Sequence, residues 1–266
     1  MELETYAEIK RSVKTLLNLN LDYYKDEQMK RRLDSWLVRS GASNWVEYFQ
    51  RVRADINERS RFRDYLTINV STFFRDPDRW QSLRDLIIPT LLKEALSLRP
   101  KDTGLKIWSA GCSIGVEAYS LAILLEELSP TRRHKIMATD FDQSALKKAK
   151  AGGPYSFEEI QNLNPAQKTA YLQPDGPPFY IKLALAKRIE FKEHNLLDDP
   201  YPGEMDLIIC RNVVIYFTSK TKDALYRKFF AALRQGGILF LGATEIIPRP
   251  HEFGLRSIGI SLYKKT

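Results

Sequence analysis

The sequence contains few of the residues that build disulfide frameworks and metal centres. Among its 266 residues are two cysteines, Cys112 and Cys210, and three histidines. Two cysteines exclude a disulfide-rich scaffold and a cysteine-rich zinc site, and the three histidines are scattered along the chain. We therefore expect no bound metal, and a protein from a reducing compartment.

Long hydrophobic runs are absent as well. The longest apolar stretches include residues 207–210 and 238–241, which have the length of buried strands rather than of membrane spans. The first twelve residues, MELETYAEIKRS, mix charged and apolar side chains and do not resemble a signal peptide. The sequence thus predicts a cytoplasmic protein that does not insert into a membrane.

Acidic residues are outnumbered by basic ones. The chain has 41 Lys and Arg against 33 Asp and Glu, which gives a formal net charge of +8. Such an excess favours an acidic partner. By charge alone this partner could be nucleic acid, an anionic membrane or an acidic protein surface.

The central stretch, residues 106–125, has the pattern of a strand, a glycine turn and a helix. Its apolar start ends at Gly111, the turn closes with Gly115, and Ala118 and Leu121 begin a periodic apolar face. Glycines let the backbone approach a ligand closely, and the N-terminus of the following helix favours negative charge. The pattern is typical of nucleotide-binding folds, although a plain strand-to-helix turn shares it.

The next strand supplies an acid. Residues 135–139 are extended in character and end on Asp140, where nucleotide-binding folds hold an acid for the ribose hydroxyls. Gly111 and Gly115 do not complete the G-x-G-x-x-G pattern of dinucleotide sites. Together the two strands favour a nucleoside cofactor.

Three parts of the chain are expected from the pattern. Residues 1–66 contain a single glycine, Gly41, and apolar residues at helical spacing, which predicts a small all-helical domain. Residues 67–104 form a lid or linker segment followed by a helix. Residues 105–266 alternate strands and helices, which implies an α/β domain with a mostly parallel sheet and an antiparallel end. Within them, the proline-rich residues 155–187 interrupt the rhythm and predict an insertion with a helical portion and a small antiparallel piece.

Further elements follow from the same patterns. We expect extended runs at 67–71 and 179–183, strands at 188–195, 205–210 and 238–242, a helix at 218–234 that ends at Gln235-Gly236-Gly237, and a closing hairpin at 255–264.

Basic residues gather on one predicted helix of the N-terminal part. Lys30, Arg31 and Arg32 are consecutive, so at least two of them point away from the core, and Arg39 can extend the basic face. A solvated face is one interpretation, and a docking surface for an acidic partner is the other.

Several motifs in a fixed order resemble those of CheR-type chemotaxis receptor methyltransferases. The blocks are Asn69–Pro77, Trp108–Ser120, Ala138–Asp142, His194–Leu197 and Cys210–Phe217. The resemblance covers nearly the whole chain, including the helical N-terminus. It implies a Rossmann-like S-adenosylmethionine-dependent methyltransferase domain that converts glutamate side chains of chemoreceptors to methyl esters, with S-adenosylhomocysteine as product.

The resemblance also implies a set of cofactor-binding residues. They are Asn69, Ser71 and Arg75 before the central stretch, Gly111 and Glu117 within it, Asp140 for the ribose, and Asn195, Leu196, Asn212 and Val213 for the adenine and the methionyl end. One departure is Val116, where the family has the first acid of a Gly-Glu-Glu motif.

Arg75 and Tyr216 are the expected catalytic residues. A glutamate carboxylate has a pKa of about 4.3 and is already ionised at neutral pH, so its attack on a methyl sulfonium needs no general base. Arg75 can hold the incoming carboxylate by charge-assisted hydrogen bonds. Tyr216 follows the buried strand 205–210 and is expected at the carboxyl end of the sheet, where its hydroxyl could orient the substrate.

The expected partner is the acidic helical region of a chemoreceptor. Lys30, Arg31, Arg32 and Arg39 could dock along it. The resemblance also implies that the insertion can bind a receptor C-terminal peptide, with residues 174–183 as the candidate surface, although Pro177 and Pro178 could blunt its edge. We expect a monomer.

Two other functions are alternatives to receptor methylation. A nucleic-acid methyltransferase would suit the charge, but base-modifying enzymes usually carry an Asp/Asn-Pro-Pro-Tyr/Phe loop after the fourth strand, where this chain has Cys210–Val213. A basic stripe with interleaved aromatic residues is also absent, so no nucleic-acid partner is expected. The second alternative is a non-catalytic cofactor-binding module.

Overall fold

The computed structural model describes residues 3–67, 71–100 and 104–266. The chain divides into two compact units. The helical unit comprises Met1–Asn69 and a later segment, Tyr216–Asp223, and the sheet unit comprises Val70–Ile215 and Ala224–Thr266.

Four helices and a short 3-10 turn build the helical unit. They are α1 (Leu3–Leu17), η1 (Leu21–Tyr23), α2 (Asp26–Ser40), α3 (Trp45–Ala54) and α4 (Ile56–Leu66). Gly41 ends α2 in the left-handed conformation, with φ of 66°, which a glycine adopts without strain. Asn44 caps α3 by accepting from the backbone N–H of Glu47 at 3.0 Å. The core is aromatic, since Phe62 packs against Trp36, Trp45, Tyr48 and Phe49.

The segment Tyr216–Asp223 joins the helical unit through backbone pairing. Tyr24 and Phe217 form an isolated antiparallel bridge, and their rings lie 5.0 Å apart. The N–H of Lys25 donates to the Tyr216 carbonyl at 3.0 Å, and the N–H of Thr218 donates to the Tyr23 carbonyl at 3.0 Å. Tyr216 is therefore anchored to the turn that precedes α2.

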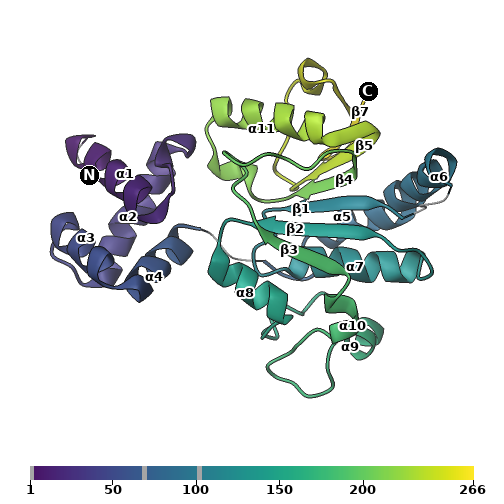
Figure 1. Ribbon diagram of the computed structural model, residues 1–266, viewed down its shortest axis with the longest axis horizontal. Coiled ribbons are helices and arrows are strands. Elements are labelled where there is room, and N and C mark those ends of the chain that lie inside the picture. Colours follow the sequence, from purple (N-terminus) through teal and green to yellow (C-terminus); the bar gives the residue numbers. More distant parts are fainter. Residues whose placement is uncertain (1–2, 68–70, 101–103) are drawn as a thin grey trace. The chain divides into compact units, whose positions relative to one another are not determined.

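A seven-stranded sheet forms the centre of the other unit (Figure 1). Its strands are β1 (Lys106–Ala110), β2 (Lys135–Asp140), β3 (Ile189–Glu193), β4 (Met205–Cys210), β5 (Leu233–Leu241), β6 (Leu255–Gly259) and β7 (Leu262–Lys265). The order is β3-β2-β1-β4-β5-β7-β6. The first five strands are parallel, and β7 runs antiparallel to both β5 and β6. The predicted parallel sheet with an antiparallel end is confirmed.

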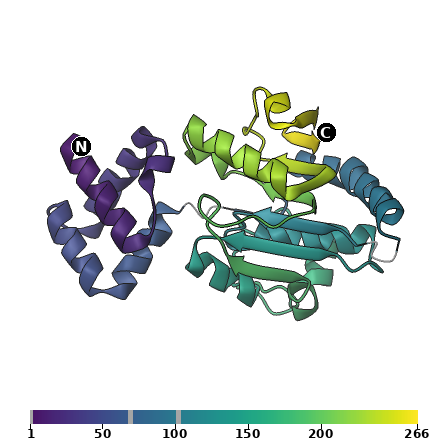
Figure 2. The same cartoon turned by 45° about the horizontal axis from the view of Figure 1, so that its top comes forward.

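Helices cover both faces of this sheet (Figure 2). The helical elements after residue 70 are α5 (Pro77–Ser82), a π-turn (Leu83–Ile87) that continues into α6 (Ile88–Leu98), α7 (Val116–Leu128), α8 (Gln143–Ala151), α9 (Pro165–Tyr171) and α10 (Leu183–Ala186) of the insertion, and α11 (Ser219–Ala232), with 3-10 turns at Val214–Tyr216 and Pro250–Phe253. No helix among the described residues is both long enough and apolar enough to cross a membrane.

Alternate strand residues fill the two cores. Ile107, Ile209 and Phe240 belong to the main hydrophobic core, together with residues of α5, α6 and α7. Trp108 points to the opposite face, because neighbouring strand residues alternate. There its ring lies 5.9 Å from that of Phe229 on α11. Both sheet faces are therefore buried, as expected for parallel strands.

The boundary between α11 and β5 differs from the prediction. The sequence predicts a helix that reaches residue 234 and stops at Gln235, Gly236 and Gly237, but the helix ends at Ala232 and both glycines lie within β5. Met205 pairs with Leu233 and Leu207 pairs with Ile238, so β5 bulges between these pairs. The glycines serve this bulge: Gly236 has φ of 75°, and a Cβ on Gly237 would lie 2.7 Å from the Met205 carbonyl oxygen.

The insertion also differs in detail. Its antiparallel pairing consists of the isolated bridges Tyr155↔Phe179 and Leu172↔Ile181. The run expected to be extended through Leu183 stops earlier, because Leu183 begins α10, which packs beside α7. The extended run predicted at 67–71 falls largely on residues 68–70, which lie outside the described residues.

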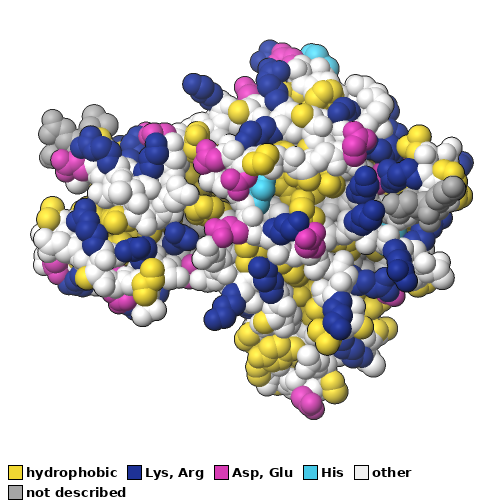
Figure 3. Space-filling model, in the orientation of Figure 1, with side chains coloured by type: hydrophobic (Ala, Val, Ile, Leu, Met, Phe, Trp, Pro, Cys, Tyr) yellow, Lys and Arg dark blue, Asp and Glu magenta, His cyan; other side chains and the backbone are white. Residues whose placement is uncertain are grey.

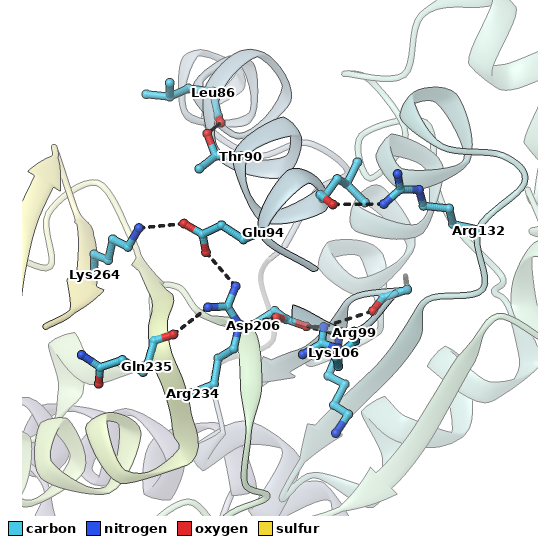
Figure 4. A network of polar contacts seen from close by, with 12 residues as sticks. Leu86, Thr90, Glu94, Arg99, Lys106, Arg132, Asp206, Arg234, Gln235 and Lys264 are labelled. Carbon is cyan, nitrogen blue, oxygen red and sulfur yellow. Dashed lines mark hydrogen bonds and ion pairs between the residues drawn. The ribbon is translucent and has the colours of Figure 1, made fainter. Parts of the chain in front are cut away.

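A buried carboxylate ties four elements together at the amino ends of the strands (Figure 4). Asp206 on β4 is fully buried. It accepts hydrogen bonds from Arg234 Nε at 2.5 Å, an Arg99 guanidinium nitrogen at 2.7 Å and the Lys106 backbone N–H at 2.8 Å. Arg234 also donates to Glu94 at 2.8 Å. This Asp206 network links β4 to β1, to β5 and to the end of α6.

Asp206→Asn is expected to destabilise the protein strongly. The amide keeps the shape of the side chain but removes its charge, which leaves the buried Arg234 without full compensation. Breaking such a buried pair costs about 3 kcal/mol or more. Urea denaturation measures the change.

Glu190→Gln provides the matched control. Glu190 forms an ion pair with Lys192 in which both side chains are more than half exposed, and such pairs contribute little. Equal unfolding midpoints for the two variants would contradict the importance of the Asp206 network.

Candidate active site

The candidate site lies where the strand order of the sheet reverses. β1 is followed along the chain by its neighbour β2 on one side, whereas β4 lies on its other side. Ligands of open α/β sheets bind outside the carboxyl ends of the strands at this point. Gly111 follows β1 with φ of 81°, and a Cβ there would lie 2.6 Å from a methyl of Val213, which follows β4. Glycine is thus required for the two loops to approach each other.

Asp140 holds the turn after β1 in place. Its carboxylate accepts the backbone N–H of Ser113 at 2.7 Å and that of Asp142 at 2.9 Å. Burial raises the pKa of Asp140 to about 6, although these backbone donors oppose the shift. The Phe141 backbone N–H is a third donor that opposes the shift. A carboxylate has about four acceptor sites, so capacity remains for a hydroxyl group of a ligand.

Glu117 is the second acid of the site and, like Asp140, is partly buried. It lies in the first turn of α7 and accepts a hydrogen bond from the Ser109 hydroxyl at 2.7 Å. Burial raises its pKa to about 7, while the positive charges of Arg211 and Arg75 act in the opposite direction. An acid in this state is stabilised in its ionised form by a cationic ligand.

Glu245 organises the loop after β4 and was not singled out from the sequence. This buried side chain accepts backbone N–H groups of Gly242 at 2.6 Å, Asn212 at 2.7 Å and Ile215 at 3.1 Å. Asn212 has φ of 59°, a conformation that costs energy for most residues and that asparagine tolerates best. Three backbone donors on one carboxylate therefore fix the loop that carries Asn212 and Val213.

Asn195 and Leu196 begin the loop after β3. The backbone N–H of His194 donates to the Asp140 carbonyl at 3.0 Å, which places this loop beside the end of β2. The Asn195 side chain is engaged within its own loop, since it accepts from the N–H of Leu197 at 3.0 Å and donates to Asp198 at 2.8 Å. The buried Leu196 is available for apolar contact only.

The segment before α5 has unusual backbone geometry on both sides of Arg75. Phe74 and Asp76 have φ of 46° and 57°, which is strained for residues other than glycine. Ser71 is half-buried, and Asn69 lies outside the described residues. Arg75 therefore lies between two strained residues, and neighbouring groups must stabilise this backbone conformation.

The remaining predicted residues lie in the helical unit. Tyr216 groups with that unit through the pairing described above. On α2, Arg31 and Arg39 are exposed, whereas Arg32 is partly buried. Arg32 donates to the Tyr65 carbonyl and lies over the Tyr65 ring at 4.7 Å. Lys30 lies 4.9 Å above the Tyr6 ring.

The described residues contain no cluster of His, Cys, Asp and Glu suited to hold a metal ion. Cys112 and Cys210 are both buried as free thiols, and burial raises the pKa of each well above its ordinary value. They act as small apolar residues in this part of the core.

Comparison with known proteins extends over nearly the whole chain. Residues 69–260 match the model of the CheR methyltransferase SAM-binding domain, and residues 4–67 match that of the CheR methyltransferase all-alpha domain. The chain belongs to the CheR methyltransferase family. Its cofactor is S-adenosylmethionine.

Curated relatives of the CheR family align along most of their own length. A chemotaxis protein methyltransferase of Listeria innocua is 40% identical over 98% of this chain and 97% of its own. One from Borreliella burgdorferi is 34% identical over 91% and 89% of the two chains, and one from Salmonella typhimurium is 33% identical over 88% and 81%.

The residues present fit S-adenosylmethionine, which carries a sulfonium, an ammonium and two ribose hydroxyls. Asp140 retains acceptor capacity for hydroxyls, and Glu117 is a partly buried acid with a raised pKa whose ionised form a cation would stabilise. Gly111 and Gly115, with φ of 81° and 86°, keep the turn between them free of Cβ atoms at both ends. The match to the SAM-binding domain and the observed strand order confirm the expected Rossmann-like methyltransferase fold and its cofactor.

Cofactor affinity is expected to rise with pH. A carboxyl with a pKa of about 7 is mostly protonated at pH 6 and mostly ionised at pH 8. Because the cationic cofactor favours ionised Glu117, its affinity should increase about tenfold over this interval. Isothermal titration at both pH values measures the change.

Glu117→Gln serves as the control for this titration. Its cofactor affinity should be lower at pH 8 and should lack the step near pH 7. An unchanged wild-type affinity between pH 6 and pH 8 would contradict the role of Glu117.

Proposed function

We propose that this protein is a cytoplasmic protein-glutamate O-methyltransferase that converts glutamates of chemoreceptors to methyl esters. The observation that carries the proposal is the match to chemotaxis protein methyltransferases over up to 98% of the chain. Two partly buried acids with raised pKa values at the carboxyl ends of the strands support it.

The chemistry needs alignment more than activation. When bound, S-adenosylmethionine supplies an electrophilic methyl group; a glutamate oxygen bonds to its carbon as the carbon–sulfur electron pair returns to sulfur. Glutamate is ionised at neutral pH, so no residue has to remove a proton. The residues of this chain therefore act by binding, by orienting the two reactants and by excluding water.

Arg75 is assigned to the incoming carboxylate. Its charge acts on Glu117, the acid proposed to bind the methionyl end of the cofactor, and this electrostatic interaction supports the assignment. A guanidinium can hold one carboxylate oxygen by a charge-assisted hydrogen bond and leave the other free to attack. Tyr216 is proposed to orient the same carboxylate through its hydroxyl.

The cofactor is assigned to residues at the ends of four strands. We assign the ribose to Asp140, the cationic methionyl end to Glu117 with the close approach at Gly111, and the adenine to Asn195, Leu196, Asn212 and Val213. Asn69, Ser71 and Arg75 are proposed to cover it from the preceding segment.

An acidic helical region of the receptor is the proposed partner of α2. Lys and Arg side chains are spread over the drawn face of the helical unit, with acidic residues among them (Figure 3). Arg31 and Arg39 are exposed and suited to long-range attraction. Arg32 and Lys30 are partly buried against tyrosine rings. They therefore stabilise the packing of α2 and contribute less than Arg31 and Arg39 to attraction of the receptor.

The insertion is the proposed site for a receptor C-terminal peptide. Hydrophobic side chains gather where the insertion lies (Figure 3), and Phe157 and Leu183 are 66% and 65% exposed. Residues 174–178 lie outside any strand. Three of them are prolines without an N–H, so an added peptide would pair mainly with backbone carbonyls of this segment and with residues 179–183.

Transfer of a radiolabelled methyl group tests the function. Membranes that contain chemoreceptors should acquire label that mild base releases, because an ester is base-labile. Label on nucleic acid that resists base would indicate a nucleic-acid methyltransferase. Binding of cofactor without any transfer would indicate a non-catalytic module.

Arg75→Ala should lower the single-turnover rate much more than cofactor affinity. Loss of one positioned charge–carboxylate contact is expected to reduce the rate roughly 100-fold or more. Rapid-quench measurement at saturating cofactor gives the rate, and isothermal titration gives the affinity. Collapse of cofactor affinity with an unchanged rate would contradict the assignment of Arg75 to the substrate.

Charge reversal on α2 should weaken methylation in a salt-dependent way. Arg31→Glu with Arg39→Glu is expected to raise the KM for receptor membranes roughly tenfold at low salt, with the difference shrinking as salt screens the charges. Arg256→Glu, an exposed change on β6, is the matched control. Equal KM values for the two variants would exclude α2 as the docking surface.

A further inference from the structure

Arg211 is a buried arginine to which the proposed function assigns no role. It is the first residue after β4, and its side chain is 2% exposed. Its guanidinium donates to the Asp76 carboxylate at 2.6 Å. The guanidinium carbon lies 5.0 Å from the centre of the Phe240 ring and 5.9 Å from that of Trp80. Arg211 therefore joins the end of β4 to the segment that carries Arg75.

The partners of Arg211 surround the backbone of Arg75. The Trp80 indole N–H donates to the Arg75 carbonyl at 3.0 Å, and the ring of Phe74 packs edge-on against Trp80 at 5.2 Å. The N–H of Phe74 donates to the Ser120 hydroxyl of α7 at 2.8 Å. Each residue on either side of Arg75 is thus held by a group from the sheet or from a helix.

The strained backbone explains why such contacts are needed. Phe74 and Asp76 both adopt positive φ, a conformation that persists only where the surroundings over-determine it. The ion pair with Arg211 holds the Asp76 side chain, and the Asp76 carbonyl accepts the backbone N–H of Arg79 at 2.9 Å. Without the ion pair, Asp76 would relax and change the direction in which Arg75 leaves the backbone.

Arg234 shows what a purely structural buried arginine looks like in this protein. It is equally buried but is paired with two carboxylates, Asp206 and Glu94. Arg211 has one direct carboxylate partner, the partly exposed Asp76, and its buried Nε has no hydrogen-bond partner in the described structure. Incomplete pairing of a buried charge is a poor way to gain stability, which favours a functional purpose.

We propose that Arg211 is a positioning residue that fixes Arg75 through Asp76 and Trp80. Arg211 holds the lid backbone in its strained form, so that the Arg75 guanidinium meets the substrate carboxylate at the right place. The inference rests on the proposed function, because it assigns the alignment of that reaction to one additional side chain.

Single and double variants of the full-length protein test this role. Arg211→Lys and Asp76→Asn should each lower kcat at saturating cofactor roughly 10- to 100-fold, because small misplacements of a catalytic group have effects of this size. Cofactor affinity should stay within about threefold. In an Arg75→Ala background, Arg211→Lys should produce no further loss, because its effect passes through Arg75.

Arg234→Lys is the matched control, because it makes the same change in an equally buried arginine. It should lower the melting temperature at least as much as Arg211→Lys does, while kcat stays within about twofold of the wild type. If Arg211→Lys does not fold, the partly exposed Asp76→Asn carries the same test.

Three results would overturn the proposal. One is a wild-type kcat in both Arg211→Lys and Asp76→Asn. Another is a loss of cofactor affinity beyond about tenfold with kcat retained, which would make Arg211 a cofactor ligand. The third is an additive loss in the Arg75→Ala background. Absence of base-labile transfer by the wild type would instead contradict the proposed function itself.

Discussion

The buried carboxylate of Asp206 is the constraint on which the geometry of the sheet depends. It receives donors from the start of β1, from β5 and from the residue after α6, and it is fully removed from solvent. A buried charge with every partner in place penalises any shift of the strands past one another. Register set at the amino ends is transmitted along the strands, so the loops at the carboxyl ends meet in one arrangement.

The carboxyl ends of the strands differ in their charged groups from the amino ends. Glu117, Asp140 and Glu245 are acids whose pKa burial raises, and Arg211 is a buried cation with incomplete pairing. Ionisable groups with strongly shifted pKa values are typical of functional sites. The amino ends of the strands therefore carry a charge network that maintains the fold, and the carboxyl ends carry the acids proposed to bind the cationic cofactor.

Local patterns of the sequence predicted much of this architecture. The strand, turn and helix at residues 106–125, the acid at the end of β2 and the closing hairpin all depend on residues close in sequence, and each is confirmed. The predicted end of α11 at Gln235, Gly236 and Gly237 is wrong, because both glycines belong to β5. Their conformation serves a bulge against Met205 on another strand, and no local pattern distinguishes that from a helix stop.

The sequence by itself determined the fold class, the family and the identity of the residues proposed to bind the cofactor, because glycine turns, strand-end acids and motif spacing are local properties. Only the tertiary structure decided how those residues are supported. Glu245 reaches Asn212 across 33 positions, and Arg211 reaches Asp76 across 135. Such pairings arise from strand order and packing, and a buried charge acquires its role from whichever distant groups the fold brings to it.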